Sequence, residues 1–454
     1  MDLIKKDKTF YKAMFSIAIP VTIQNLISSS LNMVDTLMVT KLGSTNVAAV
    51  GQANQVFFLL TLLLFGISSG ASIFIAQFWG KRDRINIRRV LGLAIILGVS
   101  LSLIFTFAAL LFSKQIMRIL INDAEVIALG SKYLKIVCIS YIFTAITYAY
   151  SGACRSVRQA KLPMLISFIS ILLNTLLNYT FIFGNFGFKA MGIEGAAIAT
   201  VIARMIESFL IVSIIYRDEG NVLKAKIREL TDISSNFVKK FIHTTLPVIM
   251  NEGMWSLGVV MYSIAYASGG KEATAAVQVA ITIQNIFMVL SLGLASACAT
   301  MIGNKIGSGE EEEGILYAKK FCVIGAIAGI CLGLILYLSS PYILKIFSST
   351  SPQLYETSKK VLAVISVFIP CKLFTTVMIV GVFRGGGDTK YSMMLEVGCV
   401  WLIGVPFAFI GALVFKLPVY WVVACAYTEE IIKTLLGMPR LISKKWVKNI
   451  VEDI

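Results

Sequence analysis

Twelve long apolar stretches constrain this chain more than any other feature of its sequence. Each is close to or above the roughly 20 residues that a helix needs to cross the hydrocarbon core of a bilayer. Only helices and closed barrels satisfy their backbone hydrogen bonds there, and runs of this length favour helices. The predicted spans are about 13–40, 46–78, 90–112, 133–153, 164–184, 195–216, 241–267, 273–304, 321–339, 361–383, 391–413 and 419–438. We therefore expect an all-α membrane protein with twelve transmembrane helices.

Composition and charge agree with a membrane protein and exclude a large soluble domain. Hydrophobic residues make up 57% of the chain and charged residues 15%, against about half and a quarter in globular domains. Most of the 41 lysines and arginines lie in the termini and the even-numbered connections. Basic residues favour cytoplasmic loops, so we expect both termini in the cytoplasm. The net charge of +16 then needs no nucleic-acid partner.

Cysteine, histidine and nucleophile motifs give no support for an enzyme or a metal centre. The eight cysteines form no CxxC pair, and His243 is the only histidine. A zinc site or a disulfide framework would need such clusters. The sequence RGGGDT lacks the GK[ST] ending of a phosphate-binding loop, so we interpret it as a tight cytoplasmic turn. We expect neither catalytic residues nor a bound organic cofactor.

The two halves of the chain resemble each other. Ile19–Gly80 aligns without gaps on Leu246–Gly307 at an offset of 227, and 151–161 aligns on 380–390 at an offset of 229. Each half holds six predicted spans, so the repeats enter the membrane from the same side. Parallel repeats of this kind are an architecture of secondary transporters, with substrate held between the lobes. The predicted domains are an N-lobe at 1–216, a cytoplasmic linker at 217–240 and a C-lobe at 241–454, around a central cavity.

Polar side chains form stripes along several predicted helices. At 100° per residue, Asn25, Ser28, Asn32 and Asp35 share one face of the first span. Similar faces carry Glu252, Trp255, Tyr262 and Tyr266; Gln278, Thr282 and Asn285; Tyr141, Thr144, Tyr148 and Ser151; and Asn174 with Asn178. Such faces either join helices together or bind a ligand, and both interpretations stay open.

Acids inside spans indicate function more strongly than amides, because a charge in the bilayer is costly. Asp35 lies near the outer end of its span and Glu252 near the middle of the membrane, and either carboxylate is suited to bind a proton or a small cation. Other charges predict local pairs: Arg204 with Glu207, Glu429 with Lys433, and Glu396 near Lys390. Lys372 has no local acid, so we hypothesise a pair between Lys372 and Glu252.

Taken together, several motifs resemble the multidrug and toxic compound extrusion (MATE) transporters, within the multidrug/oligosaccharidyl-lipid/polysaccharide exporter superfamily. They are IPVTIQNLISSSLNMVDTLMVTKLG, AAVGQ, SSGASIFIAQFWGKRD, GAAIAT and RGGGDT, and the resemblance covers nearly the whole chain. It implies export of organic, mostly cationic compounds in exchange for Na⁺ or H⁺ by alternating access. No cofactor is implied beyond this coupling ion, and sodium and proton coupling both stay open.

The resemblance also implies an ion-coupling set and a possible Na⁺ site. The acid at Asp35 corresponds to one that works with positions matching Asn174, Asn178 and Thr200, and Glu252 matches the C-lobe acid of the NorM-like branch. Two departures bear on the ion. Asn178 stands where the family often has aspartate, and Thr375 stands near the place of a tenth-span acid.

The predicted substrate contacts are mostly aromatic or amide side chains, which suit flat organic cations. They are Asn32, Tyr141, Tyr148, Trp255, Tyr262, Tyr266, Gln278 and Asn285. Simple aromatic packing is the alternative interpretation. We expect small organic cations and the lipid bilayer as partners, no nucleic acid, and a monomer. A lipid-linked oligosaccharide flippase of the same superfamily is the alternative function, for which we would expect more basic residues at the binding surface than Lys372 and Arg204.

Overall fold

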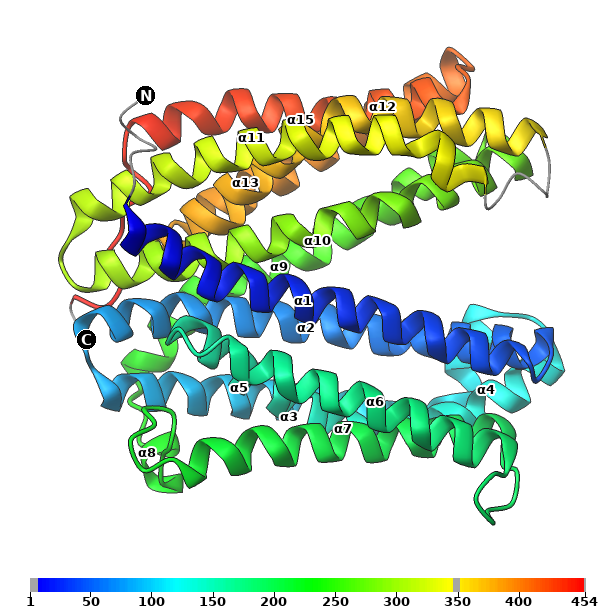
Figure 1. Ribbon diagram of the computed structural model, residues 1–454, viewed down its shortest axis with the longest axis horizontal. Helices are drawn as coiled ribbons and strands as arrows, with labels where there is room; N and C mark the ends of the chain where they lie inside the picture. The colour runs from blue at the N-terminus through cyan, green and yellow to red at the C-terminus, as the bar shows by residue number, and fades with distance from the viewer. Residues whose placement is uncertain (1–6, 346–351, 453–454) are drawn as a thin grey trace. The chain divides into compact units, whose positions relative to one another are not determined.

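Helices form all the regular structure in the residues that are described. The structure is a computed structural model that describes residues 7–345 and 352–452, with the backbone alone for residues 30–34. Figure 1 shows long helices throughout this part of the chain. The prediction of an all-α protein is confirmed.

The first six predicted spans correspond to seven helices, because the fourth span is broken. The helices are α1 (Lys8–Thr40), α2 (Ser44–Lys81), α3 (Arg84–Leu120), α4 (Ala124–Val137), α5 (Ser140–Ser156), α6 (Lys161–Phe183) and α7 (Gly192–Arg217). The axes of α4 and α5 meet at 51°, where the sequence predicts one continuous span. The Thr106 hydroxyl donates to the Cys138 carbonyl at this break, at 3.0 Å. A side chain that takes a freed backbone group is a common cause of such a kink.

The last six predicted spans include π-helical turns. The helices are α9 (Ser235–Ala267), α10 (Lys271–Gly307), α11 (Glu311–Leu344), α12 (Pro352–Thr376) continued by η3 (Val377–Phe383), then α13 (Thr389–Cys399), η4 (Val400–Gly404), α14 (Val405–Phe409) and η5 (Ile410–Val414) in one span, and α15 (Val419–Ile442). Wide turns of this type occur often at functional sites. The predicted linker holds the short helix α8 (Ile227–Thr231) and the start of α9.

Length and hydropathy alone identify nine spans in the described part of the chain, or ten when α4 and α5 count as one. The remaining two of the twelve are α9 and α15, which are long enough at 33 and 24 residues. Both carry charged residues inside their apolar sequence, namely Glu252 in α9 and Glu429, Glu430 and Lys433 in α15. These two helices hold several of the charged residues of the sites described below.

The chain packs as two compact units. The N-terminal unit comprises Ile23–Trp79 and Asp83–Leu246, and the C-terminal unit comprises the chain up to Thr22, Gly80–Arg82 and the chain from Pro247 onward. These units differ from the predicted lobes at three helix ends. The start of α1 and the end of α2 belong to the C-terminal unit, and the linker with the start of α9 belongs to the N-terminal unit. The exchanges in α1 and α9 occur at or close to Pro20 and Pro247, which are equivalent in the repeat.

Small residues allow the exchanged helix ends to pack closely. A Cβ on Gly70 of α2 would lie 2.4 Å from Thr245 Cγ2, and one on Gly293 of α10 would lie 2.1 Å from Thr22 Oγ1. A Cβ on Gly329 of α11 would meet the Pro370 Cα at 2.8 Å. Close backbone approach through small residues is the usual way that helices associate in lipid.

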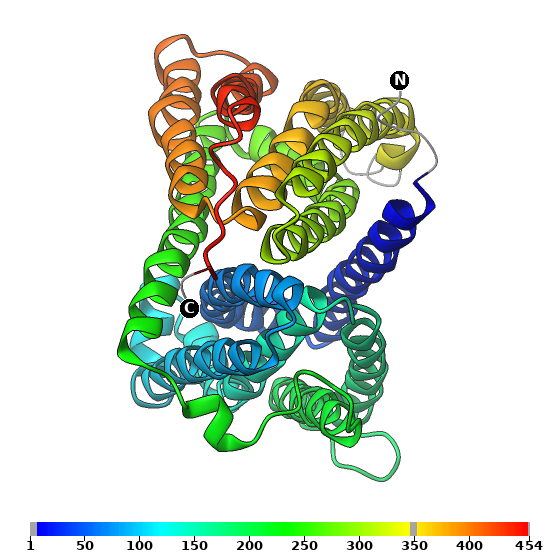
Figure 2. The same ribbon diagram turned by 90° about the vertical axis from the view of Figure 1, so that its left-hand side faces the viewer.

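In each unit, the segment after the last helix folds back on the turn that precedes the fifth span. Asn221 donates to Gln159 at 3.2 Å in the N-terminal unit, and Lys448 donates to Asp388 at 2.5 Å in the C-terminal unit. The two pairs are related by the repeat offsets of 227 and 229. We call residues 443–452 the C-terminal strap, which is the extended red segment after α15 in Figure 2.

Candidate functional site

Asp35 of α1 lies against two asparagines of α6 in the N-terminal unit. Asn178 Nδ2 donates to Asp35 Oδ1 at 2.6 Å and to Asn174 Oδ1 at 3.1 Å. Both asparagines are 2% exposed, whereas Asp35 is half-buried. Asn174 and Asn178 are one helical turn apart and share a face of α6, so Asn178 links Asn174 to the carboxylate. The structure thus brings together three of the four residues expected to form a cation site.

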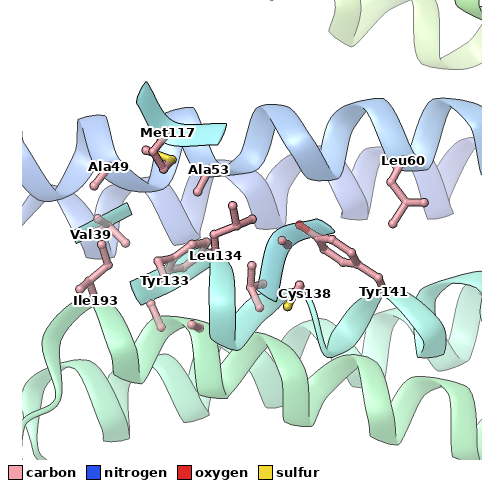
Figure 3. Close-up of a cluster of buried hydrophobic side chains, with 14 of the residues drawn as sticks. Val39, Ala49, Ala53, Leu60, Met117, Tyr133, Leu134, Cys138, Tyr141 and Ile193 are labelled. Carbon is pink, nitrogen blue, oxygen red and sulfur yellow. The ribbon is translucent and has the colours of Figure 1, made fainter. Parts of the chain in front are cut away.

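Other neighbours of Asp35 come from α4 and α7. Tyr133 of α4 has both Asp35 and Thr200 as neighbours in its electrostatic environment, and Figure 3 shows this tyrosine in the buried core. The Arg204 guanidinium, one turn beyond Thr200, is a charged neighbour of Asp35. Arg204 pairs with Glu207 at 3.1 Å, which confirms the predicted i,i+3 pair. Arg204 is therefore neutralised locally and leaves Asp35 without a direct ion pair among the described residues.

The oxygen atoms around Asp35 include one that lacks a partner. Asn178 Oδ1 is buried and accepts no hydrogen bond in the described structure, although an unsatisfied buried acceptor costs about 1–3 kcal/mol. Carboxylate, amide and hydroxyl oxygens are the ligands that hard cations prefer. The oxygens of Asp35, Asn174, Asn178 and Thr200 are thus of the type that could hold a small hard cation such as Na⁺.

The other predicted contacts in the N-terminal unit lie in different environments. The side chain of Asn32 lies outside the described residues. Tyr141 is fully buried and stacks on Phe57 with ring centroids 5.7 Å apart, and Figure 3 shows it within the same core as Tyr133. Tyr148 is half-buried beside Arg204 and Arg155. Of these tyrosines, only Tyr148 combines partial exposure with charged neighbours.

In the C-terminal unit, Glu252 of α9 pairs with an arginine that the sequence hypothesis did not select. Arg384 Nη1 lies 2.7 Å from Glu252 Oε1, and Arg384 Nη2 lies 3.4 Å from Glu396 Oε2. Asn251 Nδ2 donates to the same Glu396 oxygen at 2.7 Å. The hypothesised Glu252–Lys372 pair is therefore wrong, and Glu396 faces Arg384 and Asn251 where we had expected it to pair near Lys390.

A second charged cluster lies on α15. Lys433 pairs with Glu429 at 3.0 Å, which confirms the predicted i,i+4 pair, and lies 3.6 Å from Glu430. The Tyr262 hydroxyl of α9 donates to Glu429, and the Thr375 hydroxyl of α12 donates to Glu430 at 2.6 Å. All three charged side chains are at most 8% exposed. Each of these buried charges has both a counter-charge and a hydrogen-bond partner, as burial requires.

Lys372 of α12 belongs to the edge of this second cluster. Its ammonium lies 4.9 Å from the ring centroid of Tyr427, within the range of a cation–π contact. Glu430 and Glu429 are its acidic neighbours. The Tyr427 hydroxyl donates to the buried Gln284 at 2.7 Å. The charge of Lys372 is thus balanced by α15 and an aromatic ring, which explains why it does not need Glu252.

The predicted aromatic and amide contacts of the C-terminal unit fall into two groups. Tyr262 and Tyr266 stack at 6.4 Å next to the α15 cluster, and Trp255 is half-buried on the same helix. Gln278 and Asn285 are exposed on α10. The stripe prediction therefore places both amides on an accessible face, but it missed Gln284, the buried amide of α10.

Sequence reasoning also missed Arg384 as a site residue. Its position at the head of RGGGDT suggested a turn, yet Arg384 is 2% exposed. The repeat held a usable signal, since Arg384 aligns with Arg155. An arginine kept in both halves beside a helical span is a candidate for a buried ion pair.

Comparison with known proteins identifies the family. The family model MatE matches residues 20–180 and 247–410, one match in each half of the repeat. The chain belongs to the MatE family. Its members are membrane transporters, so this chain is a multi-pass membrane transporter of the MATE family, as the sequence motifs indicated.

Individual relatives agree over nearly the full length. The chain is 25% identical to a probable multidrug resistance protein NorM of Thermotoga maritima, over 97% of this chain and 94% of that protein. It is 26% identical to the uncharacterized transporter YisQ of Bacillus subtilis, over 98% and 96%. Among solved structures, the Vibrio cholerae MATE transporter VcmN superposes with a TM-score of 0.89 at 18% identity, covering 98% of both chains. This likeness confirms the MATE fold of twelve helices in two halves.

Proposed function

We propose that this MATE transporter is a secondary antiporter that exports organic, mostly cationic compounds in exchange for Na⁺ or H⁺. Relatives named as probable multidrug resistance proteins support export of drug-like compounds. The observation that carries the proposal is the presence of a separate acid site in each unit. Asp35 is held by an amide and Glu252 by a guanidinium, so each carboxylate has a partner that a cation can replace.

The Asp35 site is the proposed coupling site. A proton requires only the carboxylate, whereas Na⁺ would also use the oxygens of Asn174, Asn178 and Thr200. A bound sodium ion would neutralise Asp35 and give the buried Asn178 Oδ1 a partner. Arg204 is a charged neighbour of Asp35 but pairs with Glu207, so the Asp35 carboxylate stays available to the ion.

The Glu252 site is proposed to meet the substrate cation, or to share in coupling. The half-buried Trp255 lies one turn along α9 from Glu252, and an aromatic face beside a carboxylate suits a flat organic cation. The flippase alternative is less well supported, because Arg204, Arg384 and Lys433 all pair with carboxylates. A site for a polyanionic headgroup would leave such charges available.

A transport assay with two separate gradients tests this proposal. Purified protein in liposomes loaded with ethidium is given either an inward Na⁺ gradient or an inward H⁺ gradient. We expect one of the two gradients to drive ethidium efflux. Asp35→Asn abolishes that response, and Glu252→Gln lowers ethidium affinity. The exposed acid Glu125 of the N-terminal unit supplies the control, Glu125→Gln, which retains transport. Wild-type protein that responds to neither gradient contradicts the proposal.

We also propose that the chain acts as a monomer in a bacterial inner membrane, with both termini in the cytoplasm. The bias of basic residues toward the termini and even-numbered connections supports the orientation of the termini. Labelling of single cysteines by an impermeant maleimide in intact cells tests it. A cysteine at exposed Lys189, between α6 and α7, is expected to react from outside, and one at exposed Glu312, at the start of α11, only after lysis.

A further inference from the structure

Arg384 is surrounded by more acid than its own charge balances. Glu252 and Glu396 flank the guanidinium, at 2.7 Å and 3.4 Å. Two carboxylates and one guanidinium leave one negative charge in excess within this group. Lys433 of α15 is the next cation, as an electrostatic neighbour of Glu396, but its direct ion pairs are with Glu429 and Glu430. The acid pair therefore has room for one more positive charge.

Accessibility differs between the members of this group. The Arg384 side chain is 2% exposed, whereas Glu252 and Glu396 are 11% and 17% exposed. The two carboxylates are thus more exposed than the guanidinium that contacts them. A cation that approached from their exposed side would contact the acids before the arginine.

The contact between Arg384 and Glu252 is close but poorly directed. Nη1 lies 2.7 Å from the carboxylate oxygen, yet this buried nitrogen makes no hydrogen bond of acceptable geometry. Arginine and carboxylate usually form two parallel, well-aligned hydrogen bonds, which make the pair strong. The misaligned contact is therefore weaker than the distance suggests, and Glu396 offers the same guanidinium a second acceptor.

The repeat shows that the two acids are a special feature of the C-terminal unit. The equivalents of Glu252 and Glu396 are Asn25 and Ser167, which carry no charge. The equivalent arginine, Arg155, is retained and has Cys154 and Tyr148 as neighbours. An amide contact is also shared by the two units. Gln24 donates to Ser167 at 3.1 Å in the N-terminal unit, and the equivalent Asn251 donates to Glu396 in the C-terminal unit. The N-terminal unit thus keeps the arginine without the two acids, and Ser167 there donates to Glu207 at 2.9 Å, whereas the C-terminal unit places two carboxylates at its arginine.

We infer that Arg384 is a tethered cation that occupies the acid pair of Glu252 and Glu396 in competition with the transported cation. When an organic cation binds Glu252, Arg384 moves its contact to Glu396. When Arg384 returns to Glu252, it displaces the cation and so promotes release. This inference rests on the proposed function at Glu252, and it adds a specific residue that sets cation affinity. Arg384 acts through the two acids and is a positioning residue.

Binding measurements on a series of charge variants test this role. The readout is the Kd of ethidium, from its fluorescence on titration with purified protein. Arg384→Gln leaves two uncompensated carboxylates and tightens binding by about tenfold or more, since close charge pairs couple by about 1.5 kcal/mol or above. Glu396→Gln removes the second acceptor and weakens binding by about tenfold. The double variant Arg384→Gln/Glu396→Gln has the same excess of one negative charge as wild type, so its Kd is expected to return toward the wild-type value.

The control is Arg155→Gln, the same change at the repeat-equivalent arginine, which leaves Kd unchanged. Arg384→Lys keeps the charge and is expected to stay within about threefold of wild type. If Arg384→Gln does not fold, the isosteric Glu396→Gln still tests the inference, because its Kd for ethidium is expected to be higher than that of wild type. Looser binding in Arg384→Gln, or equal Kd in wild type and Glu396→Gln, overturns the inference.

Transport separates this inference from the proposed function. We expect gradient-driven ethidium efflux by Arg384→Gln to show a lower KM together with a lower kcat, because binding is tighter and release is slower. Wild-type protein without gradient-driven efflux contradicts the antiport proposal, while the order of the Kd values still tests the tethered cation. Wild-type efflux with unchanged Kd across the charge series overturns the tethered cation alone.

Discussion

Removal of the Trp446 side chain is expected to destabilise the C-terminal unit. Trp446 lies in the C-terminal strap and is 1% exposed. Its indole N–H donates to the Leu441 carbonyl at 3.1 Å, and Gly386 approaches the ring so closely that a Cβ there would lie 2.4 Å from it. The strap is thus anchored on the RGGGDT turn by a large side chain that no neighbouring group can replace.

The size of the effect follows from the buried area. An aromatic side chain of this size buries about 150–250 Å², which at about 25 cal/mol per Å² is worth about 4–6 kcal/mol. Buried Trp→Ala changes cost about 3–5 kcal/mol. A domain of about 200 residues loses about 2–4 °C in Tm per kcal/mol. Trp446→Ala is therefore expected to lower the Tm of the C-terminal unit by about 10 °C.

Buried thiols provide the assay. Cys298, Cys322 and Cys399 are buried in the C-terminal unit, so a thiol-reactive fluorogenic dye reports its unfolding as detergent-solubilised protein is heated. The matched control is Trp421→Ala, since Trp421 is 54% exposed on α15 and its loss should change Tm by no more than about 2 °C. Equal Tm values for Trp446→Ala and wild type would refute the proposed anchoring.

Two further changes test individual contacts. A Cβ at Gly404 would lie 2.0 Å from the Tyr262 hydroxyl oxygen, so Gly404→Ala should cost about 1–3 kcal/mol by overpacking; a Tm equal to that of wild type in the thiol assay would refute this. In the linker, the backbone N–H of Lys226 and the guanidinium of Arg88 lower the pKa of Glu229. A carboxylate with a lowered pKa stabilises the folded linker above its ordinary pKa, and this support is lost as the pH falls through the folded value. Glu229→Gln should therefore raise tryptic cleavage of the linker about two- to fivefold at pH 8, as expected for an exposed ion pair, and unchanged cleavage would count against the contact.

Contacts within one helix were predictable from the sequence, and contacts between helices were not. The Arg204–Glu207 and Glu429–Lys433 pairs follow from helical spacing, and the structure shows both. The partner of Glu252 depends on which helix packs against α9, and spacing along one helix contains no such information. The repeat reduces the number of candidate partners, because Arg384 is equivalent to Arg155 in the other half of the chain.

The sequence pattern also did not predict the irregularities of the backbone. The break between α4 and α5 depends on the Thr106 hydroxyl from another helix, and hydropathy reports only the apolar length of the segment. The Asp35–Asn178–Asn174 arrangement was expected from family motifs, since polar spacing alone gave two separate stripes. Their roles in ion coupling stay a prediction.

Ethidium efflux from proteoliposomes under an imposed ion gradient tests the central claim most directly. The account predicts that wild-type protein exports ethidium when Na⁺ or H⁺ flows inward. It also predicts that Asp35→Asn binds ethidium normally and no longer responds to that gradient. Gradient-driven efflux by Asp35→Asn at the wild-type rate would contradict the account, because coupling would then not require the carboxylate that Asn178 holds.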